Sequence, residues 1–293
     1  MVLGAIAKLN LSKEEAELKS NLETIIAQDT SVNEQGKVEL VEGVAKDRLI
    51  STTDPEMRHG RKSSSNRFDG YKVHSAIDEA SEFITNVAVT PGNVHDSEAV
   101  VDLIDTQPAV LSTEAILGDS AYGTGKVRAE MEEREIEVVA PVNEGTIRPG
   151  MFSKSEFEID LEAETCRCPG GLIAIKKSYS KDGNRLKEFI FSKDQCRTCE
   201  LYQNCISNKT GHRTITVNEY ERQLQKGRAY QKTEEFEEIY SNRYKVERKQ
   251  AEMVRHGMRQ AKFIGKAKIN LQALMVATLI NFKLLAKLTP VAT

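Results

Sequence analysis

The first part of the chain combines one amphipathic segment with polar stretches. Residues 11–28 carry an apolar stripe at helical spacing, made by Leu11, Leu18, Leu22, Ile25 and Ile26. Ser12 stands three residues before Glu15, which is the spacing of a capping box. We therefore predict a helix over 11–28. Residues 29–46 predict a linker or weak hairpin, residues 48–52 a strand, and residues 54–66 an exposed basic loop.

From residue 71 the pattern changes to that of strands. Polar and apolar residues alternate from Tyr71 to Ile77, and a second strand-like run covers 83–90, which together predict a half-buried hairpin. A helix over 96–104, an apolar run over 115–119, a helix over 125–134 and an apolar strand over 136–142 follow. The order strand, strand, helix, strand, helix, strand predicts an α/β fold with helices covering the sheet.

The last half of the chain is first polar and then helical. Short strand-like pieces at 187–191 and 213–217 lie in a polar, cysteine-bearing stretch. Helical periodicity returns over 234–288 with a break near Gly265, and its last apolar part suits a core helix. We expect four segments: an acidic helical segment with a linker (1–47), the first part of the main domain (48–148), a cysteine-rich insertion (149–232), and C-terminal helices that complete the domain (233–293).

The charges are distributed unevenly along the chain, and the sequence argues against a secreted protein and against a membrane protein. The net charge of the 293 residues is −3, yet residues 243–268 hold nine Lys or Arg and two Glu. Such a basic stripe can contact phosphates or can be a solvated helix face. The N-terminus lacks the features of a signal peptide. Polar residues interrupt the apolar run 269–285, which favours a buried helix over a membrane span, so we predict a cytoplasmic protein with no membrane partner.

Five cysteines cluster between residues 166 and 205. An odd number of cysteines in a reducing compartment favours a metal site or free thiols over disulfides. Four thiolates can hold Zn²⁺ tetrahedrally, and the spacing favours Cys168, Cys196, Cys199 and Cys205 as its ligands, with Cys166 as a spare. A structural zinc ion would fold an insertion too small to have its own core. Free buried thiols are the alternative.

Two acidic motifs are candidates for chemistry. The run 116–123 delivers Asp119 to the carboxyl end of an apolar strand, where ligands bind in open α/β sheets; the alternative is a cap of the next helix. Tyr240, Arg243 and Glu247 are spaced by three and four residues, which puts them on one face of a helix. A carboxylate there can bind a metal while the guanidinium contacts phosphate; the alternative is a surface ion pair.

Several ordered motifs resemble one family. The runs 53–56, 70–78 and 89–96, the segment Gly118-Asp119-Ser120-Ala121-Tyr122-Gly123, and the Tyr240-x2-Arg243-x3-Glu247 pattern are similar to the DDE transposases of bacterial insertion sequences. The resemblance covers roughly residues 47–288. It implies a ribonuclease H-like mixed sheet with flanking helices, interrupted by a small cysteine-rich insertion.

The resemblance also implies an activity and a site. Carboxylates of such enzymes bind two Mg²⁺ or Mn²⁺ ions for DNA cleavage and strand transfer. Asp119 would be the second carboxylate ligand and Glu247 the third, with Arg243 and Tyr240 orienting the glutamate or contacting DNA. Lys72 is a further candidate for DNA contact. Double-stranded DNA at the element ends and target would be the partner, and a homodimer is implied.

The match to the family pattern has one gap. The first aspartate of the family stands on a strand before residue 71, and no apolar strand with an Asp precedes residue 48. We therefore expect a transposase that is truncated at its N-terminus and inactive alone, with Asp54 and Asp78 as the nearest substitutes. The hypothesis from a different class is a zinc-ribbon nucleic-acid-binding protein without catalysis. The histidines have simpler interpretations: His74 as a packed residue and His95 as a helix cap.

Overall fold

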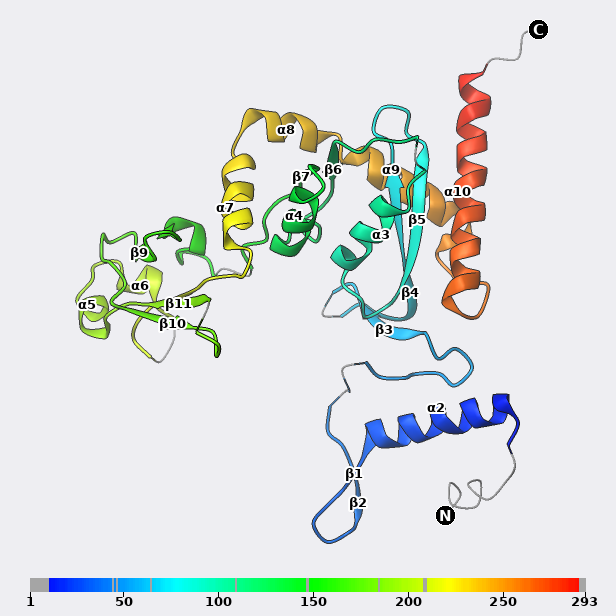
Figure 1. Cartoon of the computed structure of the whole chain (residues 1–293), viewed down its shortest axis with the longest axis horizontal. Helices are drawn as coiled ribbons and strands as arrows, with labels where there is room; N and C mark the ends of the chain where they lie inside the picture. Colours follow the sequence, from blue (N-terminus) through cyan, green and yellow to red (C-terminus); the bar gives the residue numbers. More distant parts are fainter. Residues whose placement is uncertain are drawn as a thin grey trace. The chain divides into compact units, whose positions relative to one another are not determined.

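The computed structural model describes residues 11–289 except 44, 46, 64, 109, 146, 147, 184, 208 and 209. The chain divides into two compact units, which are described separately below (Figure 1). Unit 1 consists of Met1–Leu111 with Tyr244–Thr293, and unit 2 consists of Ser112–Arg243. Both units are mixtures of helices and small sheets, so the expected α/β class is confirmed at that level.

The centre of unit 1 is an antiparallel hairpin. Strand β4 (Arg67–Ile77) pairs with β5 (Ile84–Pro91), with Val73 opposite Val89. The predicted hairpin is confirmed. The short strand β3 (Arg58–Arg61) pairs with the start of β4, so the prediction of a loop over 54–66 is wrong there. The strand predicted at 48–52 is absent, since these described residues form no strand.

Helices cover both faces of this hairpin (Figure 1). On one face α10 (Lys266–Leu288) and the end of α9 (Tyr244–Met253) build the core of the unit. Its buried residues are Ile84, Val87, Val89, Met253, Ile269, Ala273, Val276, Ala277 and Ile280. On the other face lie η1 (Asp96–Ala99) and α3 (Val100–Asp105), where the Asn86 amide donates to Leu103 O at 2.9 Å.

The N-terminal part of unit 1 begins with α2 (Lys13–Asp29). The predicted capping box is confirmed, because Ser12 N donates to Glu15 Oε2 at 2.8 Å and the Ser12 side chain accepts from Glu15 N. A weak hairpin follows, formed by β1 (Thr30–Val32) and β2 (Val38–Leu40). No residue of α2 is buried.

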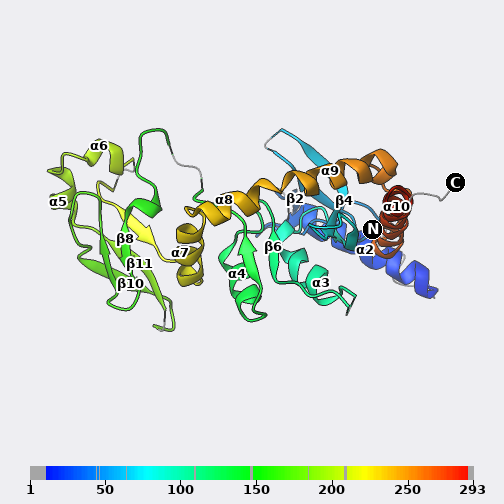
Figure 2. The same ribbon diagram turned by 90° about the horizontal axis from the view of Figure 1, so that it is seen from above.

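Unit 2 starts with a strand–helix–strand motif. Strand β6 (Ala115–Leu117) runs parallel to β7 (Glu137–Val139), and α4 (Gly125–Glu132) connects them. The predicted elements are confirmed, although both strands are shorter than expected. Helix α7 (Glu221–Tyr230) contacts α4, and α8 (Glu234–Ser241) contacts β7. A view turned by 90° shows the same elements of this unit from above (Figure 2).

The cysteine-bearing part of unit 2 has a hydrophobic core of its own. Its strands are β8 (Glu158–Asp160), β9 (Thr165–Arg167), β10 (Lys176–Tyr179), β11 (Leu186–Ile190) and β12 (Thr214–Thr216), and its short helices are η2 (Lys154–Glu156), α5 (Lys193–Arg197) and α6 (Tyr202–Cys205). Phe157, Cys166, Leu186, Phe189, Phe191, Cys196, Ile206, Ile215 and Val217 are buried together. The expectation that this part is too small for a core is therefore wrong.

The C-terminal helices break at three places. Helix α8 ends at Ser241, residues 242 and 243 separate it from the start of α9, and the π-helical segment η3 (Val254–Met258) follows α9. Gly257 has φ 99° and Gly265 has φ 88°, a region in which glycine has no steric penalty. The break predicted near Gly265 is confirmed, and the other two were not predicted.

Candidate functional site

Asp119 lies in the turn after strand β6. Gly118 N donates to Val139 O at 3.2 Å, which continues the pairing with β7, and the exposed Asp119 follows. Its Oδ1 accepts a hydrogen bond from Ala121 N at 2.9 Å. The N-cap of α4 is Thr124, whose side chain accepts from Val127 N. Asp119 is thus at the carboxyl end of the strand, as predicted, and the alternative of a cap on the next helix is wrong.

The glycines of this turn are required by close contacts. A Cβ on Gly118 would lie 2.8 Å from Cδ2 of Tyr122, and a Cβ on Gly123 would lie 2.0 Å from Pro141 O. The second distance is well inside van der Waals contact with a backbone atom, so Gly123 cannot be replaced without moving the backbone. These contacts fix the path of the chain on both sides of Asp119.

Arg128 of α4 bonds the backbone of the same turn and of β7, and the sequence analysis did not single it out. The side chain is buried, and its guanidinium donates to Gly123 O at 3.3 Å, to Val138 O at 3.2 Å and to Ala140 O. Burial lowers the pKa of Arg128. A Cβ on Gly227 would lie 2.5 Å from Cζ of Arg128, so α7 needs a glycine where it passes the guanidinium. No local pattern in the sequence marks this arginine.

Glu247 is exposed in the first turn of α9. The prediction that Tyr240, Arg243 and Glu247 share a face of one helix is wrong, because α8 ends at Ser241 and α9 begins at Tyr244. Residues 242 and 243 form a turn, closed by the bond from Arg243 N to Tyr240 O at 3.1 Å. Asn242 favours such a turn over a helix interior.

Tyr240 and Arg243 form a small aromatic stack at the end of α8. The rings of Phe236 and Tyr240 are stacked with centroids 5.2 Å apart, and Cζ of Arg243 lies 5.7 Å from the centroid of Tyr240. The guanidinium of Arg243 therefore lies over the tyrosine ring. Tyr240, Arg243 and Asp119 belong to unit 2, whereas Glu247 belongs to unit 1.

Asp54 has a structural role in unit 1. It is 7% exposed and accepts hydrogen bonds from the Tyr71 hydroxyl at 2.5 Å and from Gly265 N at 3.2 Å. Glu56 Oε2 accepts from Lys266 N at 2.8 Å. The two carboxylates thereby satisfy N–H groups at the start of α10, which have no partner within the helix. Burial, and then the hydrogen bond to Asp54, raise the pKa of Tyr71.

The second substitute, Asp78, closes the hairpin turn. It is exposed, and its Oδ2 accepts from Ser81 N at 2.7 Å and from the Ser81 hydroxyl. These two hydrogen bonds lower the pKa of Asp78. Asp78 therefore stabilises the turn between β4 and β5 through a side-chain bond to the backbone three residues on.

Lys72, His74 and His95 all have partners within unit 1. The Lys72 ammonium donates to Asp96 Oδ1 and to Val94 O, each at 2.8 Å. His74 is buried, lies 2.9 Å from Thr90 Oγ1, and has a pKa lowered by burial. The His95 side chain accepts from Ser97 N at the N-cap of η1. The predictions of a packed His74 and a capping His95 are confirmed.

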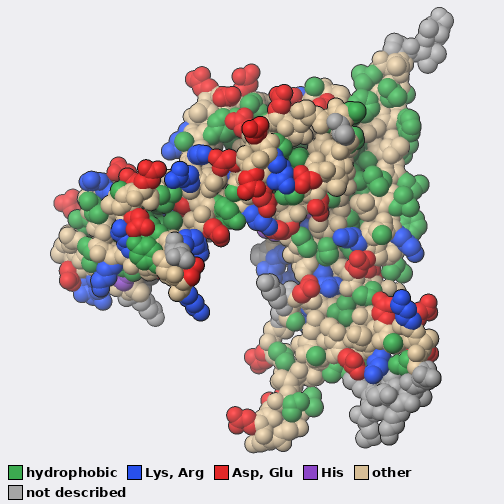
Figure 3. Space-filling view, in the orientation of Figure 1, with side chains coloured by type: hydrophobic (Ala, Val, Ile, Leu, Met, Phe, Trp, Pro, Cys, Tyr) green, Lys and Arg blue, Asp and Glu red, His purple; other side chains and the backbone are tan. Residues whose placement is uncertain are grey.

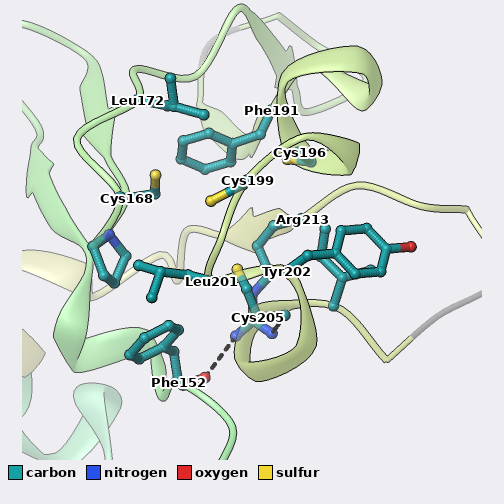
Figure 4. A pocket seen from close by; sticks show the side chains of 13 residues that line it. Phe152, Cys168, Leu172, Phe191, Cys196, Cys199, Leu201, Tyr202, Cys205 and Arg213 are labelled. Carbon is teal, nitrogen blue, oxygen red and sulfur yellow. Dashed lines mark hydrogen bonds between the residues drawn. The ribbon is translucent and has the colours of Figure 1, made fainter.

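Four of the five cysteines line one small cavity (Figure 4). Cys168, Cys196, Cys199 and Cys205 face it, together with Phe152, Leu172, Tyr202 and Arg213. Cys168 follows β9, Cys196 lies on α5 and Cys205 ends α6. A Cβ on Gly170 would lie 3.4 Å from the Cys199 sulfur and 3.7 Å from the Cys168 sulfur, so this glycine lies beside both thiols.

The environment of the thiols is apolar. Burial raises the pKa of Cys205; nearby Arg213 lowers it, and the thiols of Cys196, Cys168 and Cys199 raise it further. The cavity has a volume of about 20 Å³, room for about one water-sized particle. Cys166 does not line it, and burial raises the pKa of that thiol to about 12.

No metal cluster is preformed in the part of the chain that the structure describes. Within it, no three His, Cys, Asp or Glu side chains lie close enough together to hold an ion as they stand. The chemistry of the donors still separates two kinds of candidate: soft sulfur ligands around the cavity, and hard oxygen ligands at Asp119 and Glu247.

The basic stripe of residues 243–268 is partly neutralised. Lys245 pairs with Glu79, Arg248 pairs with Glu82, and Lys249 lies 3.4 Å from Glu252. A larger cavity of about 500 Å³ lies beside these residues. Its lining is Glu82, Arg248, Lys249, Glu252, Arg255, His256, Leu284 and Lys287, which is basic in balance.

Comparison with known proteins gives one match. The family model described as "Transposase DDE domain" matches residues 46–282. No curated protein and no solved structure matches the chain. The matched range contains every candidate residue described above, from Asp54 to Glu247, and also the cysteines.

Proposed function

This chain belongs to the DDE transposases of insertion-sequence type, because the family model covers residues 46–282, and we propose that it cleaves and joins DNA at the ends of a mobile element. The observation that carries the proposal is the exposed carboxylate of Asp119, which a turn of fixed geometry presents at the end of β6. Glu247, exposed on α9, is the second proposed catalytic carboxylate.

The chemistry explains why carboxylates are needed. Transfer of a phosphodiester requires neutralisation of charge on a non-bridging oxygen, activation of the attacking hydroxyl and stabilisation of the leaving oxygen. Mg²⁺ or Mn²⁺ supplies these functions when bound, and such hard ions prefer carboxylate oxygens. Asp119 and Glu247 would hold the metal from this chain. Arg243, whose guanidinium lies over the Tyr240 ring, would contact a phosphate of the DNA backbone.

The two nearest substitutes for the first aspartate already have hydrogen-bond partners within the fold, which does not favour them as metal ligands. Asp54 is buried and bonds the start of α10, while Asp78 closes the hairpin turn. Lys72 is a weak candidate for DNA contact, since its ammonium is held by Asp96 and Val94. Contacts to double-stranded DNA are better supported at the basic cavity that Arg248, Arg255 and Lys287 line.

We also propose a ribonuclease H-like arrangement for the catalytic domain. Its support is the order of β4, β5, α3, β6, α4 and β7, with a helix-covered hairpin and a parallel strand pair. Residues 48–148 and 233–293 would form this domain, residues 1–47 an N-terminal segment, and residues 149–232 an insertion. A family of this type acts on DNA in the cytoplasm, and the protein would bind element ends as a homodimer.

Zinc in the cysteine-bearing part is a proposal of its own. Its support is that four of five cysteines face one cavity of single-ion size while Cys166 does not. Cys168, Cys196, Cys199 and Cys205 would be the ligands, and the ion would tie β9 to α5 and α6. The same feature supports the second candidate function, a zinc-ribbon nucleic-acid-binding protein without catalysis.

Metal-dependent nicking of labelled element-end DNA separates the two functions. Supplemented with the upstream element sequence, which would supply the first carboxylate, the chain should nick this DNA with Mg²⁺ or Mn²⁺, whereas the chain alone should not. In the supplemented reaction, Asp119→Ala and Glu247→Ala should each reduce the rate by at least about 100-fold, which is more than the loss of a group that only supports a metal ligand costs. Glu237→Ala, which removes an exposed carboxylate of α8, is the matched control and should leave the rate unchanged.

Two results would contradict the catalytic proposal. One is binding of element-end DNA without any metal-dependent nicking, which is the behaviour of a binding module. The other is nicking that survives in both alanine variants. The Asp54→Ala variant should be tested for nicking, and its melting temperature should be measured at the same time. We expect any loss of nicking in this variant to result from a loss of folding stability.

A further inference from the structure

Helix α10 has the composition of a helix that is covered on all sides. Its sequence is apolar around most of its circumference, and such helices are normally buried or span a membrane. Within the described ranges it is the one helix long and apolar enough for a membrane span. Only one face, with Ile269, Ala273, Val276, Ala277 and Ile280, is buried against the hairpin.

The opposite face of α10 is an exposed apolar stripe (Figure 3). Its residues are Leu271 (55% exposed), Met275 (62%), Leu279 (45%), Phe282 (65%) and Leu285 (45%), flanked by Leu274 and Leu288. They recur at intervals of three and four residues, which puts them in one line along the helix. Monomeric proteins rarely leave contiguous apolar surfaces of this kind uncovered.

Helix α2 carries a second exposed apolar stripe in the same unit. Leu18 (53% exposed), Leu22 (36%) and Ile26 (38%) are spaced by four residues, and Ile25 extends the stripe. Its C-terminal end is tied to the following chain, where Leu49 N donates to Gln28 Oε1 at 3.0 Å and Arg48 pairs with Asp29 at 2.7 Å. No residue of the stripe is buried, and only Ile25 is half-buried.

The charges of the two helices are complementary. Residues 13–29 contain five acidic and two basic side chains, whereas residues 266–288 contain four lysines and no acidic residue. Lys268 lies on the exposed stripe of α10 by helical spacing, and Glu14 and Glu15 lie beside the stripe of α2. Two copies of α10 facing each other would bring lysines together, so α2 is the better match.

We propose that the exposed face of α10 binds helix α2 of a second copy of this chain. The pairing is reciprocal, so that the dimer contains two α2–α10 contacts related by twofold symmetry. Helix α2 and helix α10 belong to the same unit, yet within one copy the apolar stripe of α2 is not buried. In the proposed dimer, the second copy covers the stripes of both helices. The inference does not rest on catalysis by Asp119 and Glu247.

The test measures the mass of the full chain by light scattering over a range of concentrations. Wild type should be a dimer. Leu22→Glu with Ile26→Glu in α2, and Met275→Lys with Phe282→Lys in α10, should each raise the dimer Kd by at least about 100-fold, the effect expected for the loss of interface anchors. Ser20→Glu, on the opposite side of α2, is the matched control and should remain a dimer.

A mixing experiment identifies the partners of each helix. An equimolar mixture of the α2 variant and the α10 variant retains one intact α2–α10 contact, so dimers should reappear in the mixture. A dimer that persists in the α2 variant alone would indicate an α10–α10 contact and overturn the proposal. A wild-type chain that is monomeric at all concentrations, or that floats with lipid vesicles through α10, would also overturn it. Circular dichroism checks that the variants keep their helices.

Discussion

Arg128 shows how one buried charge can organise the neighbourhood of a candidate catalytic residue. Its guanidinium satisfies three backbone carbonyls, at Gly123, Val138 and Ala140, which belong to the turn after β6 and to β7 and its end. A buried carbonyl that loses its partner destabilises the fold by about 1–3 kcal/mol. Arg128 is therefore a positioning residue for the Asp119 turn and does not itself contact the proposed substrate.

Arg128→Met should destabilise unit 2 because three carbonyls lose their donor. We expect a loss of about 3 kcal/mol in the free energy of unfolding, with partial recovery in Arg128→Lys, whose single ammonium reaches fewer acceptors. Hydrogen exchange of residues 115–142 measures the effect. Arg222→Met, which removes an exposed arginine 3.5 Å from Glu162, should cost less than about 0.5 kcal/mol. Equal effects of the two variants would contradict the positioning role.

Asp54 offers a second prediction at the level of a single residue. Asp54→Ala leaves the Tyr71 hydroxyl and Gly265 N without an acceptor and should cost about 2–4 kcal/mol of stability. It should also let the pKa of Tyr71 fall towards its ordinary value, since the hydrogen bond to Asp54 is part of what raises it. Thermal melting and an ultraviolet titration of tyrosine measure the two effects.

The control for Asp54 is Asp69→Ala, because Asp69 is exposed and pairs only with His59 among the ion pairs that the structure describes. Its stability should change by about 0.5 kcal/mol or less. An Asp54→Ala variant that keeps its melting temperature and loses nicking would show that Asp54 is a metal ligand and that its structural role is minor.

Local rules explain which residues could be predicted from the sequence. The Ser12 capping box and the His95 cap act over two or three residues, and both predictions are confirmed. Asp54 bonds Gly265 across 211 positions, and Arg128 is placed by contacts with β7 and α7. Spacing in the sequence carries no information about such partners, so Arg128 and the structural role of Asp54 were missed.

At the scale of elements, apolar alternation located the strands that have a buried face. The hairpin β4–β5 has one, and its prediction is confirmed. Strand β3 has the sequence Arg-His-Gly-Arg and no such face, so nothing in its pattern distinguishes it from a basic loop. The break between α8 and α9 was missed for a related reason, since the spacing of Tyr240, Arg243 and Glu247 is helical and two turn residues do not disturb it.

The junction of α7 with the cysteine-bearing part should be sensitive to acid. Glu221 of α7 is 2% exposed and pairs with Lys154 and with Arg228, the latter at 2.9 Å. Burial alone would raise the pKa of Glu221, but the two ion pairs outweigh burial and hold the pKa below its usual value. A carboxylate with a lowered pKa in the folded state stabilises it above the unfolded value and loses this contribution as pH falls.

Glu221→Gln should therefore cost about 2 kcal/mol of stability at neutral pH and weaken the further loss of stability below about pH 4.5. Urea unfolding followed between pH 7 and pH 3 measures both effects. Glu200→Gln, at an exposed position, should leave the stability and its pH dependence as in wild type. A wild-type acid dependence in Glu221→Gln would show that other groups cause it.

At the scale of the whole molecule, the sequence predicted the order of the elements from β4 to β7. The succession from β4 to β7 is confirmed, but the chain divides at residues 111 and 243, positions that no change in composition marks. Each unit has its own hydrophobic core, one built on the β4–β5 hairpin and the other in the cysteine-bearing part. Cores depend on contacts between distant elements, and periodicity describes each element alone.

Two separate cores lead to a prediction about the proposed zinc ion. Chelation should loosen unit 2 near the cysteine cavity and leave unit 1 unchanged, because the hairpin core contains no cysteine. We expect amide exchange in residues 168–172 and 193–206 to become at least about 10-fold faster. Structural zinc binding can stabilise a fold by more than about 10 kcal/mol, so removal of the ion is sufficient to cause this change. The β11–β12 strands should keep more protection, because Phe189 and Ile215 are buried in the hydrophobic core and do not line the cavity.

Cysteine variants assign the ligands in the same experiment. Purified chain should contain one zinc ion, which Cys199→Ser and Cys205→Ser should lose, whereas Cys166→Ala should retain it because Cys166 does not line the cavity. Loss of zinc from the Cys166 variant would move the site to another set of thiols. If the chain is purified without zinc and its amide exchange does not change when zinc is added, the four thiols are free. They then lie in an apolar cavity, and burial there already raises the pKa of Cys205.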